Sequence, residues 1–156
     1  MARLRHLVVP MAALSLCGCR VSPPNAVEQR VVFFAKHHVT VRNKSAKNPV
    51  ALNPENLAAG RQAFGHYCVA CHGMDGQNTG VPFADKMSPP PPQLISPEVQ
   101  GYTDGQLKWI IDNGISPSGM PASEGTLSED EIWSIVLYLR HLPAAGSIGE
   151  PEMYSH

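Results

Sequence analysis

The central stretch of the chain, residues 73–102, is too rich in proline and glycine to form a regular helix or sheet, and it contains the four consecutive prolines 89–92. Helical patterns occur only on either side of it. Loops alone bury little apolar surface, so a chain of 156 residues with such a centre needs something for its loops to pack around. The sequence therefore predicts one small domain wrapped around a buried group, and a cofactor would serve.

Three segments beside this loop carry helix signals, and they predict helices over 53–67, 103–112 and 128–142. The first begins with an asparagine followed by a proline and an acidic residue, which is a typical helix start. The other two begin with a capping box, a serine or threonine followed three residues later by glutamate or glutamine. No strand pattern appears, so we expect an all-α domain over residues 53–143.

Residues 68–72 read Cys-Val-Ala-Cys-His and follow the first predicted helix. A tight turn there puts two thiols on one side, where they can add to the two vinyl groups of one haem, and the histidine directly after them can point at the iron. A zinc half-site is the competing interpretation, but a closed zinc site needs about four protein ligands and the domain has no second cysteine pair. A thioredoxin-like pair would need strands around it. The motif predicts one covalent haem on Cys68, Cys71 and His72.

The second axial ligand of the iron has to come from the opposite face of the haem. Methionine is the first candidate, because its thioether favours ferrous iron. Met120 lies between Gly119 and Pro121, in the loop before the last predicted helix, which is an unusual place for a core side chain. Met87, in the proline-rich loop, is the next candidate. We therefore expect His72 and Met120 to be the two iron ligands.

These features together resemble class I cytochrome c over roughly residues 51–143. The resemblance rests on the motif at 68–72, a preceding helix with Gly60 and Phe64, Met120 followed by a proline, and a last helix with Trp133 and Tyr138. It implies an all-α fold of three to four helices, with long loops wrapped around one haem. It also implies that the first and last helices cross near Gly60, where Phe64 and Tyr138 would pack.

The resemblance further implies a second bond for the haem-ligating histidine. In this family its other ring nitrogen donates to a carbonyl beside a proline, which fixes the ring. Val81-Pro82 and the 89–92 run are both candidates here. Trp109 could bond a haem propionate, as in some family members, although a core position is the stronger expectation.

The expected function is single-electron transfer rather than catalysis. With both axial positions filled, no open position remains at the iron for a substrate. Two settings stay open: a free or tethered carrier between redox proteins, or a dedicated cytochrome subunit of a dehydrogenase or respiratory complex. A third hypothesis, an enzyme or gas sensor, would require Met120 to be absent from the iron or displaceable.

Residues 1–19 read as an export signal, with two arginines before an apolar run too short to span a bilayer comfortably. Its end resembles a bacterial lipoprotein signal, in which Leu16 and Gly18 precede a lipid-modified Cys19. Cys17 fits the target position less well, and the alternatives are conventional cleavage near Gly18 or an uncleaved anchor. We expect an exported protein, either periplasmic or anchored through a lipid on Cys19 so that it faces the periplasm.

The residues after the predicted signal fall into a basic segment and an acidic segment. Residues 20–52 carry six basic residues and one acidic residue, a net charge of +5, whereas residues 53–156 carry a net charge of −8. We interpret the first segment as a basic tether, in which His37 and His38 are solvated rather than metal ligands, and residues 144–156 as a flexible tail. The acidic domain predicts redox partners with a basic docking surface. No nucleic-acid partner is expected.

Overall fold

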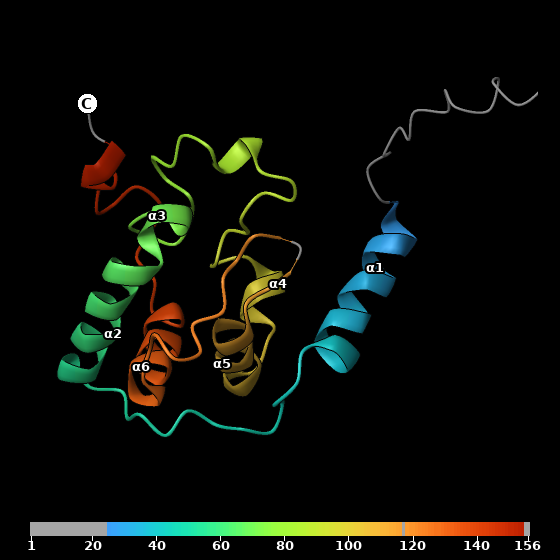
Figure 1. The fold of residues 1–156 in the computed structure, drawn as a ribbon, viewed down its shortest axis with the longest axis horizontal. Coiled ribbons are helices and arrows are strands. Elements are labelled where there is room, and N and C mark those ends of the chain that lie inside the picture. The colour runs from blue at the N-terminus through green and yellow to red at the C-terminus, as the bar shows by residue number, and fades with distance from the viewer. Residues whose placement is uncertain (1–24, 117, 155–156) are drawn as a thin grey trace, which may run out of the picture.

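The computed structural model describes residues 25–116 and 118–154 (Figure 1). Its elements are α1 (Ala26–Ala35), η1 (Lys36–Thr40), α2 (Pro54–Tyr67), α3 (Val69–His72), η2 (Ala84–Lys86), α4 (Pro97–Gln100), α5 (Asp104–Asn113), α6 (Glu129–Leu139) and η3 (Glu152–Tyr154). Across these two ranges the chain forms helices and no strand, which confirms the expected all-α class. The predicted signal, with Cys17 and Cys19, lies outside the described residues. None of the described helices is long and apolar enough to cross a bilayer.

The three long helices of the domain begin where their capping residues predict. The Asn53 side chain accepts the backbone N–H of Asn56 at 2.8 Å and opens α2. Thr103 and Ser128 each form a complete capping box at the start of α5 and α6. Each box pairs two backbone donors that the first helical turn leaves without partners. Local sequence therefore sets these three boundaries.

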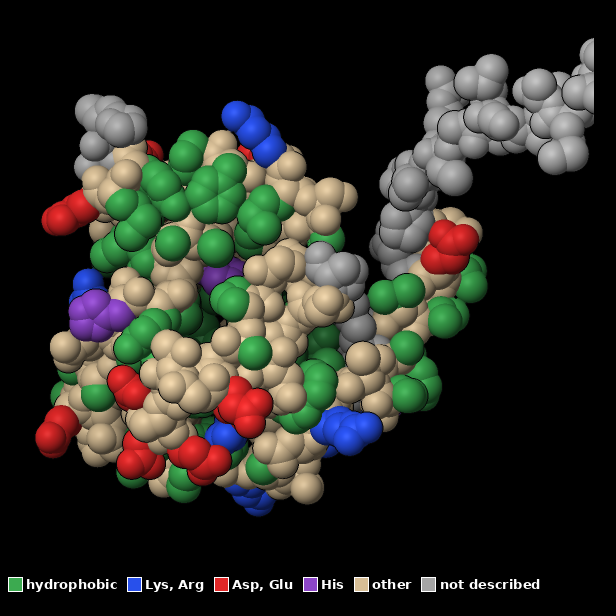
Figure 2. Space-filling model, in the orientation of Figure 1, with side chains coloured by type: hydrophobic (Ala, Val, Ile, Leu, Met, Phe, Trp, Pro, Cys, Tyr) green, Lys and Arg blue, Asp and Glu red, His purple; other side chains and the backbone are tan. Residues whose placement is uncertain are grey.

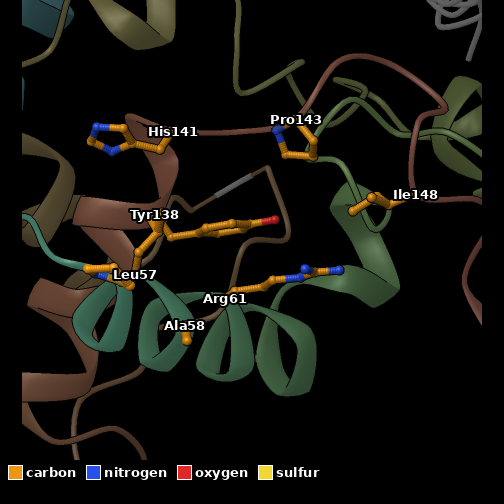
Figure 3. A pocket seen from close by; sticks show the side chains of 8 residues that line it. Leu57, Ala58, Arg61, Tyr138, His141, Pro143 and Ile148 are labelled. Atoms are coloured by element: carbon orange, nitrogen blue, oxygen red, sulfur yellow. The ribbon is translucent and has the colours of Figure 1, made fainter.

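Helices α2 and α6 cross at Gly60, as the family resemblance implies. The absence of a side chain at Gly60 lets the α6 backbone at Ser134 approach α2 closely. Beside the crossing, the Phe64 and Tyr138 rings pack with centroids 5.4 Å apart and planes tilted by 56°. Figure 3 shows Tyr138 lying over the α2 backbone near Ala58. The crossed helices α2 and α6 form the surface against which the rest of the domain packs.

The core lies between this helix pair and α5. Phe64, Ile135 and Val136 are almost completely buried at its centre. At the end of α6, the Arg140 guanidinium donates to the Asp104 carboxylate at 2.9 Å and to the backbone carbonyl of Gln100 at 3.0 Å. These bonds join the end of α6 to the start of α5, so the third long helix is held at a fixed place relative to the crossing.

Two parts of the chain differ from the sequence-based expectation. The basic tether contains the helix α1, and residues 144–154, expected to be a flexible tail, pack against the domain. In that C-terminal segment the backbone N–H of Gly146 donates to Asp75 at 2.7 Å, and the Tyr154 hydroxyl donates to the carbonyl of Ala70 at 2.9 Å. The Tyr154 ring also meets Phe83 edge to face. The segment therefore covers the turn that carries the two cysteines.

Asp75 is the buried anchor of this C-terminal segment. Its side chain is 0 % exposed, and its carboxylate accepts bonds from the N–H of Gln77 (2.9 Å), the hydroxyl of Thr79 (2.6 Å) and the N–H of Gly146 (2.7 Å). Burial alone would raise the pKa of Asp75. The bonds from Thr79, Gly146 and Gln77 outweigh it and hold the pKa below its ordinary value. The fold thus stabilises the charged carboxylate.

We expect Asp75→Asn to lower the free energy of unfolding by on the order of 2 kcal/mol at neutral pH, because a charged acceptor of three bonds is lost. A carboxylate whose pKa is depressed by folding adds stability above about pH 4, and this is lost as pH falls through the folded-state pKa. The gap between wild type and variant should therefore narrow in acid. Urea denaturation of the haem-loaded proteins at neutral and acidic pH measures both effects. Asp85→Asn, at an exposed carboxylate, is the control and should match wild type.

Candidate haem site

A single turn brings Cys68, Cys71 and His72 together at the end of α2. Cys68 ends α2 and begins α3: its N–H donates to the carbonyl of Phe64 at 2.9 Å, and its own carbonyl accepts the N–H of His72 at 3.0 Å. Gly73 ends α3 with φ at +71°, and a side chain there would meet the backbone of Thr79 at 2.8 Å. The chain therefore has to turn sharply away directly after the histidine.

The two cysteine thiols are free and partly buried. Burial, with a smaller contribution from Cys71, raises the pKa of Cys68 to about 12. The thiolate is the form that binds zinc and attacks disulfides, and this environment disfavours it. Burial therefore favours the protonated form of the Cys68 thiol.

His72 is half-buried, and its Nδ1 atom is fully buried with no partner in good hydrogen-bonding geometry among the described residues. Burial lowers the pKa of His72, and the backbone carbonyl of Pro92 acts in the opposite direction. Of the two predicted carbonyl candidates, the structure thus favours the 89–92 run. When the Nδ1 atom of a neutral imidazole lies beside a carbonyl, its Nε2 atom remains available to bind a metal ion.

Asn78 holds this proline run against the histidine, and the sequence analysis did not single it out. Its N–H donates to the carbonyl of His72 at 2.8 Å, and its side-chain amide donates to the carbonyl of Pro91 at 2.8 Å. Its φ of +65° lies in the left-handed region that asparagine tolerates better than most residues. The Asn-Thr-Gly turn after the motif is the sequence signal that could have identified it.

The two candidate methionines lie in neighbouring loops. Met120 is partly buried against the core, and its carbonyl accepts the N–H of Ile115 at 3.1 Å. Gly114 makes this loop possible, because its φ is +66° and a side chain there would lie 2.5 Å from the Met120 carbonyl. The methyl group of Met87 lies 3.7 Å from where a side chain on Gly119 would begin. Both thioethers are therefore near one segment, and Met120 is the one packed on the core.

The residues present fit a covalently attached haem. Two free thiols share one turn with a neutral histidine whose buried Nδ1 sits beside a carbonyl, and a core-packed thioether stands in a constrained loop. Figure 2 shows the visible face hollowed near its middle, with hydrophobic side chains gathered above the hollow. Trp109 is partly buried against the core, as expected.

A pocket of about 370 Å³ lies elsewhere, between α2, the end of α6 and the C-terminal segment (Figure 3). Its lining includes Leu57, Arg61, Tyr138 and Ile148, and no cysteine or methionine. The pocket is therefore separate from the side chains that would hold a haem.

Comparisons with known proteins agree with this geometry. The family described as "Cytochrome C oxidase, cbb3-type, subunit III" matches residues 55–139. Cytochrome c6 of Tetradesmus obliquus is 31 % identical over 84 residues, which are 54 % of this chain and 88 % of the relative. The quinohemoprotein alcohol dehydrogenase ADH IIB of Pseudomonas putida is 26 % identical over 95 residues, which are 58 % of this chain and only 12 % of that protein.

One solved structure shares the fold. It is a chain of the reducing HAO-like protein complex of Kuenenia stuttgartiensis, which aligns with a TM-score of 0.50 and 22 % identity over 71 % of this chain and 51 % of its own length. At that identity the likeness concerns the fold alone.

Proposed function

The chain belongs to the c-type cytochrome family described as cytochrome c oxidase, cbb3-type, subunit III, and from this premise we propose that residues 68–72 and Met120 form the haem site of an exported electron carrier. As a member of this family it is an electron-transfer protein rather than an enzyme, with covalent haem c as its cofactor. Cys68 and Cys71 would hold the haem through thioether bonds, and His72 and Met120 would bind its iron. The buried Nδ1 of His72 beside Pro92 is the observation that carries this assignment.

When bound, haem c supplies one-electron exchange between ferric and ferrous iron. The protein contributes a fixed ligand set. Asn78 holds the proline run in place, so that the His72 ring keeps one orientation, with its Nδ1 atom beside the Pro92 carbonyl. Met120 would keep water and small ligands from the iron. A ligand set that stays in place would keep the rearrangement on electron transfer small.

The partners are redox proteins, and the net charge of −8 over residues 53–156 favours those with a basic docking surface. The likeness to part of a quinohemoprotein alcohol dehydrogenase supports the second setting, a cytochrome subunit that serves a dehydrogenase. The features of residues 1–19 support export and a lipid on Cys19, which would keep the carrier at the periplasmic face of the membrane. Purification of the native protein, alone or in a complex, separates carrier from subunit.

The function is tested by a reduced-minus-oxidised spectrum and a redox titration of the full chain, exported in a host that attaches haem c. We expect one haem with a single one-electron transition. Colourless mature protein would overturn the proposal, and a reduced protein that binds carbon monoxide at neutral pH would favour the enzyme or sensor hypothesis.

Met120→Ala is expected to lower the midpoint potential and to open the iron to carbon monoxide, because a thioether ligand favours the ferrous state. The measurements are a redox titration and the absorption band of the sulfur–iron bond. Met87→Ala, in the neighbouring loop, is the matched variant and should leave both unchanged. If Met87→Ala loses the band and Met120→Ala keeps it, the ligand assignment is wrong.

A further inference from the structure

Exposed apolar side chains are concentrated on α1 and η1. Of the ten large hydrophobic side chains that are exposed in the described part of the chain, five lie in this short stretch: Val27, Val31, Val32, Phe34 and Val39. In Figure 1, α1 stands apart from the α2–α6 domain, and Figure 2 shows hydrophobic side chains along it. Such a cluster away from the core marks an interaction surface.

The helix has its own start signal and one apolar face. The Asn25 side chain accepts the N–H of Val27 at 3.0 Å and of Glu28 at 2.9 Å, and the Glu28 carboxylate accepts the N–H of Asn25 at 2.9 Å. Val27, Val31 and Phe34 follow at helical spacing on one side and are 69 %, 62 % and 59 % exposed. A helix of ten residues is marginal alone in water, so a surface that covers this face would stabilise it.

The charged residues near α1 indicate what kind of surface would cover its apolar face. Within α1, Arg30 is balanced by Glu28; Lys36 follows in η1, and residues 20–52 as a whole carry a net charge of +5. Arg42, Lys44 and Lys47 lie beyond η1, where Val41, Ala46 and Asn48 contact the haem domain. Basic residues beside an apolar helix face are complementary to anionic lipid headgroups above acyl chains.

We propose that α1 lies in the surface of an anionic bilayer, with Val27, Val31 and Phe34 toward the acyl chains and the basic residues among the headgroups. The inference deepens the membrane attachment in the proposed function, but it does not need a lipid on Cys19. The contact of α1 with the bilayer would therefore be independent of any acyl chains on Cys19.

The test uses the haem-loaded chain from residue 20 onward, exported behind an unrelated cleavable signal, so that no acyl chain is present. Co-sedimentation with vesicles is compared between phosphatidylcholine alone and phosphatidylcholine mixed with phosphatidylglycerol. We expect binding about tenfold tighter to the anionic vesicles, weakened by salt. Val31→Asp should reduce it by about tenfold or more, and Ile95→Asp, which alters an exposed apolar residue of the haem domain, should leave it unchanged.

Three outcomes would overturn the inference: no binding to either vesicle, equal binding by Val31→Asp, or a lipid-free dimer that Val31→Asp makes monomeric. The last would assign the α1 face to a second copy of the chain. If the full chain binds membranes and the chain from residue 20 does not, the lipid on Cys19 is the sole anchor, and the proposed attachment stands without α1. An unchanged haem spectrum of Val31→Asp shows that the electron-transfer domain is intact.

Discussion

Replacement of both Cys68 and Cys71 by serine is expected to abolish covalent haem retention, and each single replacement to weaken it. A serine hydroxyl cannot supply the sulfur of a thioether bond, so haem is left with the axial ligands alone and is lost on denaturation. Denaturing gels stained for haem measure the covalent fraction. Ala70→Ser is the matched control, because it adds a hydroxyl between the two cysteines and keeps both thiols; it should stain like wild type.

Undiminished staining of the double variant would refute thioether attachment. Loss of haem should also lower stability, because a cofactor that binds the folded state adds to the free energy of unfolding. The long loop over residues 73–102 would lose the group around which it packs. We therefore expect the haem-free variant to unfold at lower urea concentration than Ala70→Ser.

Gly60→Ala is expected to destabilise the folded protein by about 3 kcal/mol or more. A methyl group there would lie 2.1 Å from the carbonyl oxygen of Ser134 and 3.0 Å from the Cβ atom of Tyr138. The carbonyl belongs to the backbone of α6 and cannot rotate away, so the two helices must separate. Separation also loosens the contact between Phe64 and Tyr138. Urea denaturation of the haem-loaded protein measures the loss.

Gly65→Ala, five residues further along the same helix, is the control, and it should raise the free energy of unfolding rather than lower it. No atom lies within 4 Å of a side chain built there, and the position is exposed. Alanine favours helix over glycine, so this variant should be more stable by about 0.5–1 kcal/mol. Equal effects of the two substitutions would show that α2 and α6 do not cross closely at Gly60.

The parts of the fold that could be predicted from sequence are those coded by neighbouring residues. The starts of α5 and α6 depend on pairs three residues apart, Thr103 with Gln106 and Ser128 with Glu131, and both pairs bond as expected. The cysteines and histidine of residues 68–72 could be interpreted as a haem motif because their spacing alone carries the chemistry. Met120 stays a prediction that the variant above tests.

The remaining features depend on contacts between distant residues. No local sequence pattern indicates that Asp75 accepts a hydrogen bond from Gly146, so residues 144–154 were expected to form a flexible tail. Two carbonyls beside prolines were candidates for His72, and only the folded positions of Pro92 and Asn78 favour the later one. Helix α1 is a different case: the reciprocal bonds of Asn25 and Glu28 are a local signal that the mixed apolar pattern obscured.

The crossing of α2 and α6 has a consequence for how such a domain can be combined with others. Pro54, where α2 begins, and Pro143, just after α6, line the same pocket, so the start of the first long helix and the end of the last lie at one corner of the haem-binding unit. Neither junction contains a residue that would hold the cofactor. A unit built this way can be joined to foreign polypeptide beyond residues 144–154, which pack on the turn that carries the cysteines, while its electron-carrying interior stays as it is.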